Sequence, residues 1–284
     1  MRVDRYDSLS QYTDAVETQR WNFTGDYGHG SKRSEWDAGV GYREAIRRTR
    51  EGDPSLVGQY ADKVDRMVSE FKMHDEQRAA YVPSVAGSRV VVPEYLGGSP
   101  MCMRRRQKRD IQTRSVNIYV NTTCHAVVPA DNMLKRGASI LALLEFLQMS
   151  QVSVELYLTA ELGAAREHDY IQVIHVESHP LDLSQAAFAI AHPAFARQIT
   201  YAMASAKVGF TGSFPYSWDG GDRSRQWGRG EAGTYEPKLR AAVGMQPQDI
   251  YIPMPGMWTS EIMDSPETWL ENRIRTLRGN EEVA

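Results

Sequence analysis

The chain has 284 residues, of which 42% are hydrophobic and 24% charged, and this composition is typical of a folded globular protein. Its formal net charge of −3 excludes a uniformly basic nucleic-acid coat but leaves room for a local basic patch. The two cysteines are too few for a disulfide framework, and the first residues lack the apolar core of a signal peptide, so we expect a cytoplasmic protein that spans no membrane.

The first 114 residues mix irregular and helical patterns. Residues 1–40 combine aromatic residues with turn formers, which favours an irregular arm, whereas residues 42–50 and 55–71 have the apolar spacing of helices. Residues 82–100 contain three prolines and three glycines, which favours an extended passage across the surface or a sheet edge. We therefore expect residues 1–114 to form a helical and extended region that packs on the domain that follows.

Strands and helices alternate from residue 115 onward. Interleaved patterns of this kind predict an α/β domain of three layers with a mostly parallel sheet over residues 115–284. A glycine-rich and aromatic segment at 209–235 predicts a flap on that domain. The expected strands are 116–121, 152–158, 170–176 and 249–253, and the expected helices are 131–149, 182–191, 193–206 and 265–277.

Polar residues follow the first of these strands, where an open α/β sheet binds its ligands. Asn121, Thr123 and His125 supply an amide, a hydroxyl and an imidazole, and no carboxylate accompanies them. A hard cation prefers carboxylate oxygens, so this end of the strand is a poor metal site. We expect a surface there that binds another macromolecule.

The order of strand, polar loop, Lys135-Arg136-Gly137, helix and strand resembles the von Willebrand factor A-like fold. The start of the helix, residues 136–143, is similar to sequences of uncharacterised bacteriophage proteins. That fold holds a metal with an Asp-x-Ser-x-Ser motif, and the matching positions here are Asn121, Thr123 and His125, so the resemblance implies the scaffold without the ion. Proteins of this scaffold act as docking modules. The resemblance thus implies a phage-encoded, non-enzymatic adaptor in the host cytoplasm, whose partner is a polymerase, an ATPase or an assembly component.

Two sets of residues predict the surfaces on which such a protein acts. The adaptor reading assigns partner contacts to the strand end and to the flap. The alternative is a single-stranded nucleic-acid-binding or transcription accessory protein, in which guanidiniums neutralise phosphates and indole rings stack on bases. A basic run of this kind is equally compatible with a solvated connector. The partner-binding residues are Asn121, Thr123, His125, Trp218 and Trp227, and the nucleic-acid-binding residues are Arg104, Arg105, Arg106, Lys108, Arg109, Arg223, Arg225 and Arg229.

An enzymatic reading is the weakest of the three. Cys124 and His125 are neighbours, and neighbouring residues of an extended chain point to opposite faces, so they do not form a nucleophile and base pair. His175 and His179 lie in or near a predicted strand and lack the spacing of a helical zinc motif. No glycine-rich phosphate-binding motif occurs. We therefore expect no catalytic residue, no metal and no cofactor.

Overall fold

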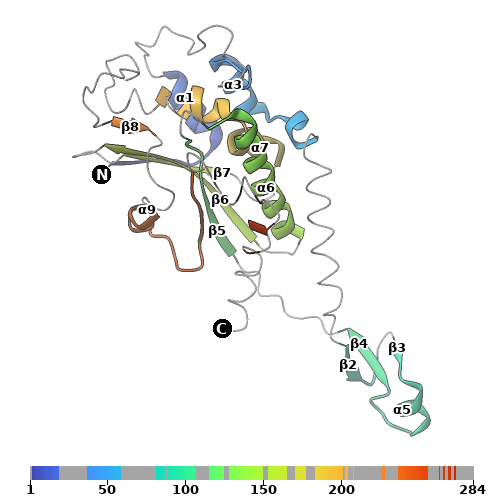
Figure 1. Cartoon of the computed structure of the whole chain (residues 1–284). Coiled ribbons are helices and arrows are strands. Elements are labelled where there is room, and N and C mark those ends of the chain that lie inside the picture. The colour runs from blue at the N-terminus through green and yellow to red at the C-terminus, as the bar shows by residue number, and fades with distance from the viewer. Residues whose placement is uncertain are drawn as a thin grey trace.

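The computed structural model describes most of the chain (Figure 1). The residues it describes are 2–18, 37–58, 81–86, 89–106, 115–124, 128–149, 153–164, 170–176, 183–200, 202–203, 207, 225–227, 236–254, 262, 265, 268, 269 and 272.

A mostly parallel sheet forms the centre of the main body, which we call the α/β body. Its strand order is β1-β7-β6-β5-β9, and β8 also pairs with β6. The pairs β1/β7, β5/β6 and β5/β9 are parallel, whereas β6/β7 is antiparallel. The strands are β1 (Arg2–Tyr6), β5 (Ser115–Asn121), β6 (Ser153–Ala164), β7 (Tyr170–Val176), β8 (Arg225–Trp227) and β9 (Ile250–Ile252).

Helices cover both faces of this sheet, which confirms the predicted three-layer α/β fold. One face carries α1 (Leu9–Thr18), α3 (Tyr42–Glu51), α6 (Ala130–Met149), α7 (Leu183–Ala191) and the π-helix η3 (Phe195–Thr200). The other face carries α9 (Glu236–Val243), whose Leu239 packs beside Tyr119 and Tyr251. No helix in the described ranges is both long and apolar enough to cross a lipid bilayer.

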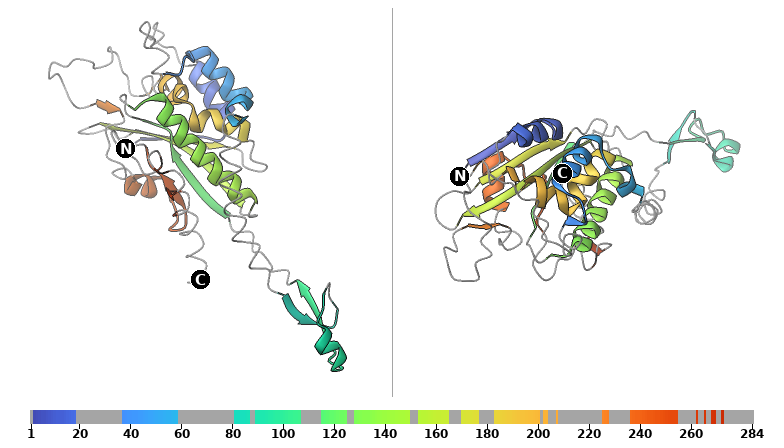
Figure 2. Two further views of the ribbon diagram at one scale, coloured as in Figure 1. Left: turned by 45° about the vertical axis from the view of Figure 1, so that its right-hand side comes forward. Right: turned by 90° about the horizontal axis from the view of Figure 1, so that it is seen from above.

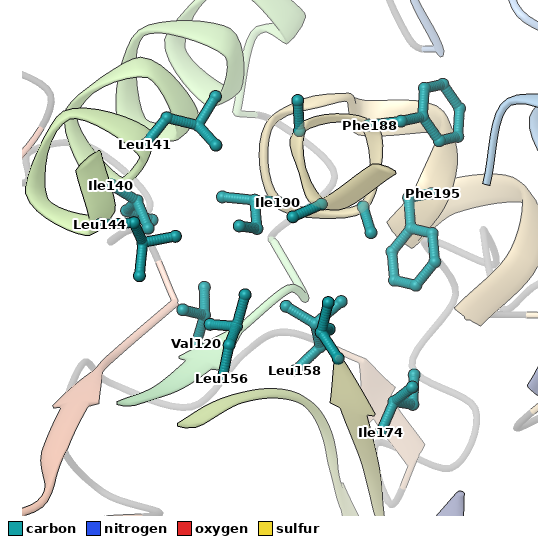
Figure 3. Close-up of a cluster of buried hydrophobic side chains, with 14 of the residues drawn as sticks. Val120, Ile140, Leu141, Leu144, Leu156, Leu158, Ile174, Phe188, Ile190 and Phe195 are labelled. Atoms are coloured by element: carbon teal, nitrogen blue, oxygen red, sulfur yellow. The ribbon is translucent and has the colours of Figure 1, made fainter. Parts of the chain in front are cut away.

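The main hydrophobic core lies between the strands and the helices of the first face (Figure 3). Leu156, Leu158 and Val120 point from the sheet toward α6 and α7 and have no exposed surface. Burial of each such side chain stabilises the fold by roughly 1.5–3 kcal/mol. The core therefore fixes α6 directly above the end of β5, where the polar residues lie.

Glycine lets α6 and α7 approach closely. A Cβ built on Gly137 would lie 2.1 Å from the Cβ and 2.3 Å from the Cα of Ala191. Because real carbon atoms do not approach to that distance, any larger residue at position 137 would push the two helices apart. The glycine thus sets the distance between the helices that cover the strand ends.

The mostly parallel sheet that the sequence predicts is confirmed, and β6 is the strand with antiparallel partners, β7 and β8. β6 extends to residue 164, and only the five residues 165–169 precede β7. A parallel crossover needs a dozen or more residues, whereas an antiparallel pair needs few. The short connection therefore decides the antiparallel pairing of β6 and β7.

The predicted irregular arm is also wrong for residues 2–18. β1 pairs in parallel with residues 170–174 of β7, and Leu9 and Tyr12 belong to the main core. The Tyr12 hydroxyl donates a 2.6 Å hydrogen bond to Oε1 of Gln172 on β7. Residues 2–18 are therefore part of the α/β body. The predicted domain boundary after residue 114 stays a prediction for the other amino-terminal residues.

Residues 81–106 form a separate small sheet with a short helix, which we call the small-sheet module. Its strands β2 (Tyr81–Ser84), β3 (Arg89–Val90) and β4 (Met103–Arg106) are antiparallel in the order β2-β4-β3, and α5 (Val92–Leu96) follows β3. Pro83 is tolerated because β2 is an edge strand, and Pro93 lies in the first turn of α5. Of the two expected alternatives, the sheet edge is therefore what β2 forms, and the module lies away from the α/β body (Figures 1 and 2).

The remaining predicted elements are described in part. The helices predicted at 42–50 and 131–149 are confirmed as α3 and α6. The helix predicted at 193–206 is the shorter π-helix η3, and residues beyond 58 of the helix predicted at 55–71 lie outside the described ranges. Of the flap at 209–235 only β8 is described, and the helix predicted at 265–277 lies mostly outside the described positions.

Candidate interaction surfaces

The polar residues at the end of β5 form an internal hydrogen-bond network. Oδ1 of Asn121 accepts hydrogen bonds from the backbone N of Thr123 at 2.9 Å and from its Oγ1 at 2.6 Å. Nδ2 of Asn121 donates to the Tyr251 hydroxyl at 3.2 Å, and both Asn121 and Thr123 have no exposed surface. Their role as partner contacts stays a prediction to which their burial gives no support, and His125 lies outside the described ranges.

A buried arginine lies at the same place. Nη2 of Arg136 donates hydrogen bonds of 2.9 Å to the backbone oxygens of Asn121 and Pro253, so this guanidinium joins the ends of β5 and β9. Only 1% of Arg136 is exposed, and burial lowers its pKa to about 10, which leaves it charged at neutral pH. The strand end is therefore cationic, because the Arg136 guanidinium contacts it. A fixed positive charge disfavours a second cation nearby.

The burial of Arg136 could have been predicted from the apolar spacing along α6, although no motif indicated it. Met133, Arg136 and Ile140 are spaced by three and four residues along α6, and the two apolar members are buried. Residues with that spacing lie on one helical face. Arg136 therefore lies on the side of α6 that faces the sheet, although its charge is typical of a surface residue.

Cys124 is a buried thiol and lies close to a second buried arginine. Burial raises the pKa of Cys124, although the charges of Arg197 and Arg136 act in the opposite direction. Nη2 of Arg197, on η3, donates a 2.6 Å hydrogen bond to the backbone oxygen of Val128. A buried thiol with a raised pKa lacks the thiolate character that a nucleophile needs.

His175 interacts with a carboxylate on the neighbouring strand. Its Nε2 lies 2.8 Å from Oε2 of Glu155, and its ring centroid lies 5.1 Å from that of Tyr157. Among the described residues there is no group of three or more histidines, cysteines, aspartates and glutamates able to hold a metal ion. His168 and His179 lie outside the described ranges.

Trp227, a residue of the predicted flap, lies on the same side of β6 as β5 and beyond the end of that strand. Leu162 of β6 pairs with Tyr170 of β7 on one side and with Trp227 of β8 on the other, which is the side of β5. Asn121 pairs with Thr159, three residues earlier on β6, so the Trp227 position lies about 10 Å farther along that strand. Arg225 pairs with Ala164 on the same strand pair, whereas Trp218, Arg223 and Arg229 lie outside the described ranges.

The small-sheet module exposes apolar side chains. Leu96 is 79% exposed and Tyr95 is 65% exposed, both on α5. Every large hydrophobic side chain that is exposed in the described part of the chain belongs to this module, namely Val85, Val90, Val92, Tyr95, Leu96 and Met101. These exposed apolar side chains make the small-sheet module a candidate interaction surface.

The predicted basic run begins on the central strand of the same module. Arg104, Arg105 and Arg106 occupy β4, and Arg104 lies directly opposite Arg89 of β3. Because residues alternate between the faces of a strand, Arg104 and Arg106 share one face and Arg105 belongs to the other. Lys108 and Arg109 lie outside the described ranges.

These features define an α/β protein with a closed polar strand end and a separate module that exposes apolar residues. The sequence matches the family described as a domain of unknown function, DUF7192, over residues 2–272. The match covers more than half of the chain, so the protein belongs to this family, whose extent includes both the α/β body and the small-sheet module. No curated protein and no solved structure matches the chain significantly. The resemblance to the von Willebrand factor A-like fold and the phage origin stay predictions.

Proposed function

We propose that the protein is a non-enzymatic adaptor that docks a partner protein through the apolar residues of the small-sheet module. The exposure of Tyr95 and Leu96 carries this proposal. Exposed apolar side chains are energetically unfavourable in water, and a partner that covers them recovers about 25 cal/mol for each Å² of apolar surface removed from water. The proposed partner therefore presents an apolar recess.

The composition of the module supports a protein partner. Residues 81–106 include two tyrosines, two methionines and four arginines, and they include no lysine. Tyrosine, methionine and arginine are enriched at protein interfaces, whereas lysine is depleted there. Tyrosine and arginine are also among the residues that dominate measured binding energies.

The position of the module supports the same proposal. None of the buried hydrophobic side chains of the described part lies between residues 81 and 106, so the module's apolar residues with described side chains serve no core. The module lies away from the α/β body (Figure 2), which leaves room for a partner around it. In this proposal the protein is phage-encoded and acts in the host cytoplasm, and the partner is a polymerase, an ATPase or an assembly component, as the sequence resemblance implies.

The test is quantitative co-purification of the full chain from its native cell, with the double variant Tyr95→Ser/Leu96→Ser. We expect wild type to recover one protein in stoichiometric amount and the double variant to recover at least about tenfold less, because loss of two central anchors costs more than 1.4 kcal/mol. The matched control is Ala241→Ser, an exposed apolar position on α9 of the α/β body. Equal recovery by wild type and the double variant, or no stoichiometric partner at all, would refute the proposal.

A further inference from the structure

We propose that Arg89, Arg104 and Arg106 form a binding surface for single-stranded nucleic acid on one face of the small sheet. We call these three residues the arginine face. The inference goes beyond the docking of a protein partner, and it rests on different residues of the module.

The strand register brings the three arginines together. Arg104 lies opposite Arg89 on β3 and opposite Pro83 on β2, and Arg106 lies opposite Tyr81. Directly opposed residues share a face, and so do residues two apart along a strand. The Cα atoms of Arg89 and Arg104 are therefore about 5 Å apart across the strands, and those of Arg104 and Arg106 are about 7 Å apart along β4. The sequence separates Arg89 from Arg104 by more than a dozen residues, so only the pairing of β3 with β4 unites them.

Charge repulsion makes this arrangement costly unless an anion is present. Like charges directly opposite each other in a sheet destabilise it, and Arg89 and Arg104 form such a pair. Residues 81–106 contain four arginines and one carboxylate, Glu94, so the module carries a net charge of +3 in a chain whose total is −3. A polyanion bound to this face would relieve the repulsion and would release its own counterions.

The residues beside the arginines favour nucleic acid over an acidic protein. The strand register places Tyr81 on the same face as Arg106. Tyrosine and arginine are residue types that proteins combine to bind single strands, the first to stack on bases and the second to neutralise phosphates. Pro83, on the same face, is exposed, which shows that solvent reaches this side of the sheet.

The experiment measures binding of the full chain to a fluorescent oligo(dT) of about 15 nucleotides, a length near the upper site size of known single-strand binders. Affinity is recorded over a series of salt concentrations. Three phosphate contacts predict a slope of about −2 for log K against log salt, since each contact contributes about −0.7. Loss of one contact, in Arg104→Gln or Arg106→Gln, should lower the affinity about five- to tenfold and make the slope about 0.7 less steep.

The matched control is Arg105→Gln, which removes the same charge from the adjacent position on the opposite face of β4. We expect its affinity to stay within about twofold of wild type, since only the long-range field changes. An equal loss in Arg105→Gln and Arg104→Gln would overturn the arginine face. Salt-independent binding, or no binding at low salt, would overturn nucleic-acid binding altogether.

Competitors identify the class of ligand. Unlabelled oligo(dT) should displace the probe more effectively than a duplex of the same length or poly-glutamate of the same charge. Stronger displacement by poly-glutamate would assign the face to an acidic protein, and stronger displacement by duplex would refute the single-strand assignment. The variants should unfold at the wild-type temperature. They should also retain the protein partner that depends on Tyr95 and Leu96, which separates failure of this inference from failure of the proposed adaptor function.

Discussion

His192 is a buried histidine whose protonation opposes folding. It is 5% exposed, its ring stacks on Phe188 with centroids 4.7 Å apart, and its Nδ1 accepts a 3.1 Å hydrogen bond from the backbone N of Ala194. Burial lowers the pKa of His192 from 6.5 to about 4, and the charge of Arg48 acts in the same direction while that of Asp53 opposes it. The neutral ring thus packs at the junction where α7 ends and η3 begins.

The expected consequence is a loss of stability in mild acid. Between pH 6.5 and 4 the unfolded chain binds a proton at His192 that the folded chain does not, so the free energy of unfolding falls as the pH falls, by at most about 3 kcal/mol. His192→Asn keeps an acceptor for Ala194 and cannot titrate, so chemical denaturation at pH 7 and pH 4.5 should show a smaller pH dependence for this variant. The control is His175→Asn, at a partly exposed histidine that contacts Glu155. This variant should retain the pH dependence of unfolding that His192 causes. An unchanged pH dependence in His192→Asn would contradict the assignment.

At the scale of secondary-structure elements, the close contact between α6 and α7 at Gly137 makes a testable prediction about stability. Alanine is a better helix former than glycine by about 1 kcal/mol, so propensity alone predicts that Gly137→Ala is stabilising. Its Cβ would meet Ala191 at 2.1 Å, however, and overpacking of a core costs about 1–3 kcal/mol. We expect the steric cost to prevail, because α6 and α7 are both fixed by the main core and cannot separate freely.

Urea denaturation compares the two outcomes directly. Gly137→Ala should unfold at lower urea concentration than wild type, with little change in the slope of the transition. Gly58→Ala is the matched control, since nothing lies within 4 Å of a Cβ at that position. That variant should be neutral or slightly stabilising, by up to about 1 kcal/mol. A stabilising effect of Gly137→Ala would show that the two helices can move apart at little cost.

For the whole molecule, the separation of the module from the α/β body predicts that stability and binding reside in different parts of the chain. Of residues 81–106, those whose burial the structure describes lie outside the buried clusters of the body. Replacement of residues 81–106 by a flexible Gly/Ser linker should therefore leave the melting temperature within about 2 °C of wild type, which corresponds to about 1 kcal/mol or less for a chain of this size. The same replacement should abolish partner capture and weaken oligonucleotide binding. A large fall in melting temperature would show that the module supports the fold of the body.

Local patterns predicted much of the α/β body. The apolar run of β5, the long amphipathic pattern of α6 and the strand at residues 170–176 are each determined by side chains that are close in the sequence, and all three are confirmed. The pattern at residues 2–18 failed because turn formers farther along the arm obscured a short strand that is stabilised by its pairing with β7. Strand pairing of that kind is a non-local interaction, which a scan of neighbouring residues does not detect.

The candidate surfaces depend even more strongly on interactions between segments that are far apart in the sequence. Polar residues after β5 were predicted as a binding surface. Asn121 and Thr123 instead hydrogen-bond to each other, and Arg136 of α6 donates a hydrogen bond to the backbone oxygen of Asn121. The run Arg104-Arg105-Arg106 was predicted as one basic patch, whereas the pairing of β4 divides it between two faces.

The sequence by itself determined the fold class, because alternation of strand and helix patterns leaves few ways to bury the apolar faces. It also determined where the positive charge is concentrated, since composition is independent of conformation. Only the tertiary structure decided which charges are buried, which are grouped and which apolar residues lie outside the core. Those properties depend on contacts between segments far apart in the chain, and the free energy of such contacts is set by packing and desolvation in three dimensions.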